Sequence, residues 1–184
     1  MCDKEIKIPK VFHELHGKTS HVSTIIMVYL AGFTAAGLIL SQIIGIELPL
    51  WKIILVGILY VDIGGGVVAN LATSTNQYYQ GKPKLRIGFI LLHLVHPALF
   101  MLVFPVFWLY FGFVGLFTLA STLVINEIGD TEFQQNLAAL LIVIGVAGSF
   151  FFEAPLPILY SFAPLFMIKL ILGFSVRRPA LNDI

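Results

Sequence analysis

Four ionisable side chains lie inside long apolar stretches of the sequence: Asp62, His93, His96 and Lys169. An ionisable group in the hydrocarbon core of a membrane costs roughly 2.5–3.5 kcal/mol on insertion scales, so each one indicates a functional or structural requirement. A carboxylate beside an imidazole can exchange a proton near neutral pH. We therefore predict that Asp62, His93 and His96 form a catalytic acid/base site.

Helix geometry predicts that Asp62 and His96 lie at the same depth. Each is ten residues from the polar end of its apolar stretch, at Ala72 for Asp62 and at Arg86 for His96. At a rise of 1.5 Å per residue, both lie about 15 Å from that end, near the middle of a bilayer core about 30 Å thick. His93 is one turn shallower on the same helix face. A hydrogen-bonded pair that only fixes the register of two helices is the alternative.

Asn70, Arg86 and Lys169 are the side chains that we expect to hold the polar group of a substrate. Lys169 has two alternatives, because its flexible stem could reach the membrane surface or its ammonium could pair with Asp62. Arg86 lies next to two lysines and two tyrosines where lipid headgroups are expected, so simple anchoring at the membrane surface is its alternative.

In an alternative interpretation, the same residues are the ligands of a metal ion. His93 and His96 are three residues apart on one helix face, and Asp62 could be the third ligand. No third histidine or cysteine accompanies them inside the apolar stretches, so we predict no metal and leave the cofactor unknown. Cys2 is the only cysteine, which excludes a disulfide within the chain.

Three consecutive glycines, Gly64 to Gly66, follow Asp62. Each weakens a helix by about 1 kcal/mol in water, so a specific reason for them is expected. Glycines let a neighbouring helix pack closely, and Gly32 and Ala36 offer the same device in the preceding apolar stretch. Alternatively, the absent side chains leave room for a ligand or water beside the carboxylate.

The composition indicates the elements that must position these residues. Of the 184 residues, 58% are hydrophobic and 11% are charged, with a mean hydropathy of +0.94. A soluble domain has roughly 25% charged residues. A membrane-spanning helix needs about 20 apolar residues, and we predict six such helices in an all-α polytopic bundle. They are residues 22–46, 50–72, two within 87–125 divided at Pro105, 133–152 and 158–176.

The distribution of Lys and Arg predicts the orientation of these helices. Cytoplasmic segments of membrane proteins are enriched in Lys and Arg. An orientation with both termini in the cytoplasm places nine cations inside and only Lys52 outside, whereas five spans would place Arg177 and Arg178 outside. We therefore divide the chain into an interfacial segment, 1–21, a transmembrane domain, 22–176, and a cytoplasmic tail, 177–184. After Pro9, the segment has the pattern of a short amphipathic helix with Gly17 as its stop.

These features predict a multi-pass protein of the cell membrane. We expect membrane lipids as its partners, and the features are also compatible with a homo-oligomer. The net charge of +1 and the lack of a basic cluster beyond the membrane flanks argue against nucleic acid as a partner. We expect an enzyme or lipid-binding protein that applies acid/base chemistry to a lipid-like or small amphiphilic molecule. The alternatives are an oligomeric proton-coupled transporter or channel, and a membrane scaffold without catalytic activity.

Overall fold

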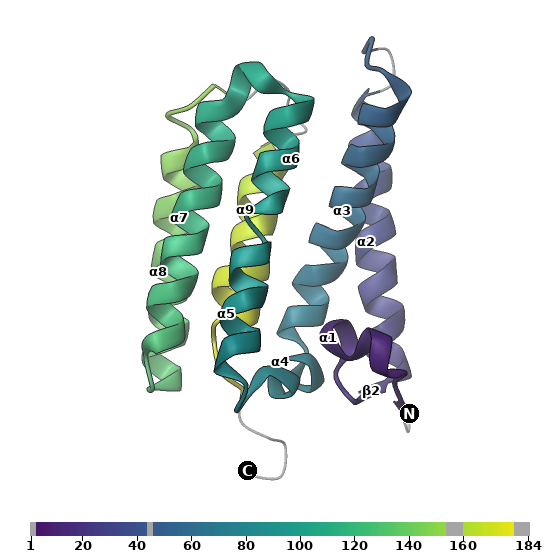
Figure 1. Ribbon diagram of the computed structural model, residues 1–184, viewed down its shortest axis with the longest axis vertical. Coiled ribbons are helices and arrows are strands. Elements are labelled where there is room, and N and C mark those ends of the chain that lie inside the picture. The colour runs from purple at the N-terminus through teal and green to yellow at the C-terminus, as the bar shows by residue number, and fades with distance from the viewer. Residues whose placement is uncertain (1–2, 44–45, 154–159, 179–184) are drawn as a thin grey trace.

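The structure is a computed structural model that describes residues 3–43, 46–153 and 160–178. These residues form a bundle of helices that run along one common axis, with a small two-stranded sheet at one end (Figure 1). The predicted all-helical architecture is confirmed, because the sheet contains only β1 (Glu5–Lys7) and β2 (Thr19–His21).

Four helical stretches of the described chain are long and apolar enough to cross a membrane. The first two are α2 (Val22–Ile43) and α3 (Leu50–Leu71). The third runs from Pro83 to Val103 and contains α5 (Pro83–Leu92) and α6 (Val95–Val103). The fourth runs from Pro105 to Glu127 and contains η2 (Pro105–Phe107) and α7 (Trp108–Glu127). These helices agree with a multi-pass membrane protein.

Two further helical segments pack against these four. They are α8 (Thr131–Ser149) and the shorter apolar stretch Phe162–Phe174, which consists of α9 (Phe162–Met167) and the π-helix η4 (Ile168–Phe174). The stretch Phe162–Phe174 lies between α3, α7 and α8 and contributes many of the fully buried side chains. Residues 154–159, which include the predicted start of the last span, lie outside the described residues.

Prolines shape the long apolar stretch between residues 87 and 125. Phe104 leaves the helical conformation with φ −127° and ψ 67°, and Pro105 begins η2, as the sequence predicted. Pro97 has no N–H to donate to the carbonyl of His93. Instead, the N–H of His96 donates to that carbonyl at 3.2 Å, so a tight turn at His93 and Leu94 joins α5 and α6.

The amino-terminal segment contains the predicted short helix after Pro9, with its end at Gly17, and also two strands that were not predicted. Its helical part is a 3-10 turn, η1 (Lys10–Phe12), and one α-turn, α1 (His13–His16), which ends at Gly17 with φ +78°. The flanking strands β1 and β2 were not predicted, because three residues are too few to show a periodicity. The segment packs on α4 (Thr73–Tyr79), where Thr75 Oγ1 donates to the Leu15 carbonyl at 2.8 Å. Burial in this contact lowers the pKa of His16.

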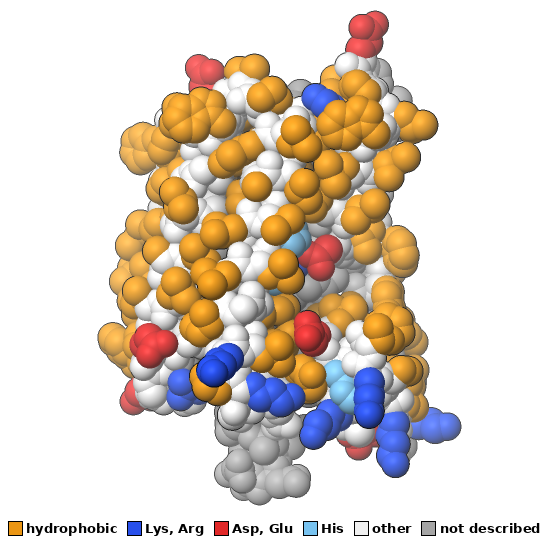
Figure 2. Space-filling model, in the orientation of Figure 1, with side chains coloured by type: hydrophobic (Ala, Val, Ile, Leu, Met, Phe, Trp, Pro, Cys, Tyr) orange, Lys and Arg blue, Asp and Glu red, His pale blue; other side chains and the backbone are white. Residues whose placement is uncertain are grey.

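Most Lys and Arg side chains gather at the end of the bundle that carries α1 and α4 (Figure 2). The last described residues lie at the same end, because the N–H of Arg178 donates to Asn76 Oδ1 in α4 at 3.1 Å. Both ends of the described chain therefore lie at the basic end of the bundle.

Helices α2 and α3 approach each other closely through small residues. A Cβ atom added at Gly32 would lie 2.6 Å from the carbonyl oxygen of Val61, and one added at Gly64 would lie 2.7 Å from the Cβ of Ala35. Such distances are below any van der Waals contact, so only glycine allows this approach. The close packing that the sequence suggested for these glycines is confirmed.

Candidate acid/base site

The structure brings Asp62, His96 and Lys169 into direct contact from three different helices. Asp62 Oδ2 accepts a hydrogen bond from His96 Nε2 at 2.5 Å and another from Lys169 Nζ at 2.5 Å. Lys169 Nζ also donates to the backbone carbonyl of Asp62 at 3.3 Å. The common depth inferred for Asp62 and His96 is therefore present in the fold, and Lys169 of η4 completes a cluster of three ionisable groups.

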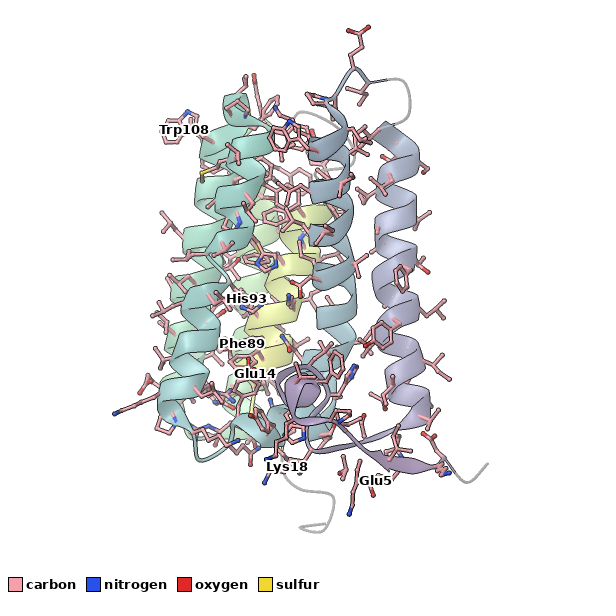
Figure 3. All side chains as sticks on the ribbon, turned by 45° about the vertical axis from the view of Figure 1, so that its right-hand side comes forward. Glu5, Glu14, Lys18, Phe89, His93 and Trp108 are labelled. Carbon is pink, nitrogen blue, oxygen red and sulfur yellow. The ribbon has the colours of Figure 1, made fainter. Side chains whose placement is uncertain are left out.

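His93 lies behind this cluster rather than on the carboxylate. Its Nδ1 donates to the carbonyl of Phe89 at 2.7 Å, one turn earlier, which leaves Nε2 as the acceptor of a neutral ring. The rings of His93 and His96 are stacked, with centroids 5.1 Å apart and planes inclined by 9°. Figure 3 shows His93 near the middle of the bundle, one turn from Phe89. The side chain is buried.

Lys169 reaches Asp62 because α3 has no side chain in its path. A Cβ added at Gly66 would lie 2.9 Å from Lys169 Nζ and still nearer to its stem. Asn70, one turn further along α3, donates through Nδ2 to the backbone carbonyl of Lys169 at 3.0 Å. The lysine also lies in a π-helix, an element that occurs frequently at functional sites. Its side chain is 2% exposed, so it does not extend to the membrane surface.

The carboxylate is the most exposed member of this otherwise buried group. The Asp62 side chain is 49% exposed, whereas those of His96 and Lys169 are 13% and 2% exposed. Asp62 lies at the wall of a cavity of about 800 Å³ formed mainly by α2 and α3, and among the described residues that line this cavity it is the only charged one. We call this cavity the apolar groove. Figure 2 shows acidic and histidine side chains in a hollow of the apolar surface at mid-height.

The apolar groove opens on the outside of the bundle. Its lining includes Phe33, Ile54 and Ile58, which are exposed on the surface that lipid would cover. Leu15, from α1, lies at the end of the groove nearest the basic end. Since α3 ends at Leu71, nine residues after Asp62, the carboxylate lies about 14 Å from that end of the helix.

The three residues expected to hold a substrate have different surroundings. Lys169 contacts Asp62 directly, and Asn70 contacts the backbone of Lys169. Arg86 is elsewhere: its Nη2 donates to the carbonyls of Phe174 and Ser175 at 2.6 and 2.7 Å, and its Nε donates to Asn126 Oδ1. Arg86 therefore caps the last turn of η4 and lies away from the carboxylate.

The three residues considered as metal ligands also lie near one another. One ligand atom each from Asp62, His93 and His96 lies within 4.8 Å of the others. However, the ammonium of Lys169 already contacts Asp62 Oδ2, and a second cation at this oxygen would be repelled by it. A metal ion bound by Oδ2 would therefore have to displace Lys169 from that oxygen.

Two features of the site were not predicted from the sequence. One is the set of residues that hold η4 in place, and the other is the set that lines the apolar groove. Arg178 donates through Nη1 to the carbonyls of Gly173 and Asn70, and Ser175 donates through Oγ to the Leu170 carbonyl. The arginine pair at 177–178 was interpreted only as a charge bias. The signal that could have revealed the groove is the set of small residues at Ala36, Gly37 and Gly57.

Comparison of this chain with protein-family models, with curated proteins and with solved structures finds no match. Its function is therefore inferred from the site. The site combines a partly exposed carboxylate, an imidazole and an ammonium on one oxygen, with a second imidazole behind them. Such a group can bind a hydrogen-bonding ligand and move a proton between ligand and imidazole.

Proposed function

We propose that this protein takes a lipid-like or small amphiphilic molecule from the bilayer into the apolar groove and exchanges a proton with its polar group. The observation that carries this proposal is the asymmetry of the Asp62 carboxylate. Both of its charged partners bind Oδ2, and no partner of Oδ1 is recorded among the described residues. A half-exposed carboxylate in an apolar wall is costly in lipid, and a ligand hydroxyl or amine would offset that cost.

In this proposal each residue of the site has a separate role. Asp62 accepts a hydrogen bond or proton from the ligand and can return the proton to it, and the Nε2–H group of His96 donates to Oδ2 and stabilises the charged form of the carboxylate. Lys169 offsets the negative charge of the carboxylate from the buried side. His93, stacked on His96, supports the position of its ring. Asn70 positions Lys169 through the backbone hydrogen bond.

We further propose six transmembrane helices, with both termini in the cytoplasm of a cell-membrane protein. Support comes from α8 and Phe162–Phe174, which pack beside the four longer helices and would complete an even number of crossings. The gathering of cations at the end that holds both ends of the described chain is the pattern expected of a cytoplasmic face.

The test compares the wild-type protein with Asp62→Asn, which keeps the shape of the side chain and removes its charge. Native mass spectrometry of protein extracted from membranes is expected to reveal a bound amphiphile on the wild type and at least tenfold less of it on Asp62→Asn, a loss of about 1.4 kcal/mol. Glu47→Gln is the matched control, since Glu47 is exposed in the loop between α2 and α3, and its ligand content should be unchanged.

Proton flux into liposomes is measured on the same samples. If the wild type conducts protons and Asp62→Asn does not, the result favours proton-coupled transport over this proposal. If Asp62→Asn changes neither ligand content nor flux, the cluster has only a structural role and the protein is better described as a scaffold.

A further inference from the structure

A second cavity, of about 530 Å³, opens at the basic end of the bundle. Its walls come from three segments that are far apart in sequence: residues 79–86, residues 126–131 and residues 177–178. We call it the basic pocket. It shares no lining residue with the apolar groove, and the inference drawn from it does not depend on the function proposed for Asp62.

The charges that line the basic pocket are strongly unbalanced. Among the described residues that line it, four cations, Lys82, Arg86, Arg177 and Arg178, face one acid, Glu127. No salt bridge among the described residues pairs any of these cations with a carboxylate. Cations held close together repel each other, so an arrangement of this kind is stabilised when an anion binds among them.

The guanidinium groups use neutral oxygens as their partners, and these partners hold them in place. Arg86 is 6% exposed and donates to the carbonyls of Phe174 and Ser175, at the end of η4. Arg177 Nη2 donates to the Asn126 carbonyl at 3.2 Å, and Arg178 Nη1 donates to the Gly173 carbonyl at 2.9 Å. Carbonyl partners orient a guanidinium without cancelling its charge, so the positive charge stays available to a ligand.

The lysine of the basic pocket is positioned in a similar way. Lys82 Nζ lies 3.4 Å from the centroid of the Tyr78 ring, a cation–π contact. A ring face holds an ammonium but leaves its N–H groups free to donate to an anion. All four cations are therefore held by neutral groups around one cavity.

We propose that the basic pocket binds a phosphate group, and that its source is the headgroup of an anionic phospholipid. Arginine side chains bind phosphate oxygens through two parallel hydrogen bonds, and lysine adds a point charge. The pocket lies where the helix bundle ends, at the level at which headgroups of the surrounding lipid are expected. Inorganic phosphate shares this chemistry and is distinguished from lipid by the experiment.

The experiment measures lipid binding to the full-length protein by native mass spectrometry, with phosphatidylglycerol and phosphatidylcholine as the two probes. Wild type is expected to prefer phosphatidylglycerol. Lys82→Gln should weaken this binding about tenfold, the effect of losing one charge-assisted hydrogen bond. Lys84→Gln is the matched control, because Lys84 has the same charge two residues away, is exposed and does not line the pocket, so its effect should stay below about twofold.

Arg177→Gln provides a second test, since Arg177 is exposed and lies on another wall of the pocket. Equal effects of Lys82→Gln and Lys84→Gln, with none from Arg177→Gln, would overturn the proposal in favour of general surface charge. Wild type that binds both lipids equally would also overturn it. Inorganic phosphate is then added at millimolar concentration: retention of the lipid supports the headgroup as the source, and full displacement overturns that source.

Discussion

At the scale of single residues, the three glycines after Asp62 have two different roles. Gly64 and Gly65 face α2, where added Cβ atoms would meet Ala35 and the Val28 carbonyl. Gly66 faces the opposite way and leaves the space that Lys169 occupies. Close packing, one of the two explanations weighed from the sequence, therefore applies to Gly64 and Gly65, whereas the space beside Gly66 holds Lys169 rather than the ligand or water that the other explanation expected. Only the structure could assign these roles, because the three glycines lie within a single helical turn and their directions depend on the rotation of α3 in the bundle.

Gly66→Ala is expected to push Lys169 away from Asp62, because the new methyl group would overlap the lysine stem. The bound amphiphile should fall as in Asp62→Asn, and overpacking should cost about 1–3 kcal/mol of stability. Ligand content and thermal unfolding in detergent are the two measurements. Gly88→Ala is the control, since a Cβ there meets nothing within 4 Å. A Gly66→Ala protein with full ligand content would show that Lys169 is dispensable for binding.

The sequence was sufficient to place Asp62 beside His96, but it left the observed pairing of Lys169 with Asp62 as one of several alternatives. Asp62 and His96 lie on apolar stretches joined by one short connection, so counting residues along each helix fixes their relative depth. Lys169 is 107 residues from Asp62, and its direction depends on the π-helix in which it lies. No periodicity in the sequence marks such a segment, because a π-helix differs from an α-helix by one widened turn.

At the scale of elements, α2 and α3 form a pair whose contact is set by backbone rather than by long side chains. Gly32 of α2 lies against the carbonyl of Val61, which directly precedes Asp62. The distance between these two helices therefore determines where the wall of the apolar groove lies.

Gly32→Ala is expected to force α2 and α3 apart, since a Cβ would lie 2.6 Å from a backbone oxygen that cannot rotate away. The expected loss is about 1–3 kcal/mol, measured as a lower midpoint of thermal unfolding in detergent. Gly37→Ala, on the same helix, should have no such cost, because a Cβ there meets nothing within 4 Å. Equal midpoints for the two variants would contradict the close contact.

The long apolar helices could be predicted from hydropathy alone, and the short elements could not. Pro105 divides its stretch as expected because a proline affects the backbone wherever it occurs. The strand pair β1 and β2, the single turn of α1 and the helix α4 depend on contacts with one another. Their sequences are too short to favour one structure, so their form is decided by packing.

At the scale of the whole molecule, the proposed six crossings predict which loops lie outside the cell. In a Cys2→Ser background, a cysteine introduced by Glu153→Cys should react with a membrane-impermeant maleimide on intact cells. A cysteine introduced by Gly129→Cys should react only after the membrane is permeabilised. Both positions are exposed, and a Cβ at Gly129 meets nothing within 4 Å, so neither change should disturb the fold. Identical reactivity at the two positions would exclude a crossing by α8.

The opening of the apolar groove on the outer surface of the bundle determines how a ligand would arrive. Phe33, Ile54 and Ile58 border the entrance, and the amino-terminal segment contributes Leu15 at the basic end. A molecule that enters there diffuses in the plane of the bilayer, so its effective concentration is its mole fraction among the lipids. Detergent that dilutes the lipids would lower the occupancy of the groove even if the affinity of the protein stayed the same.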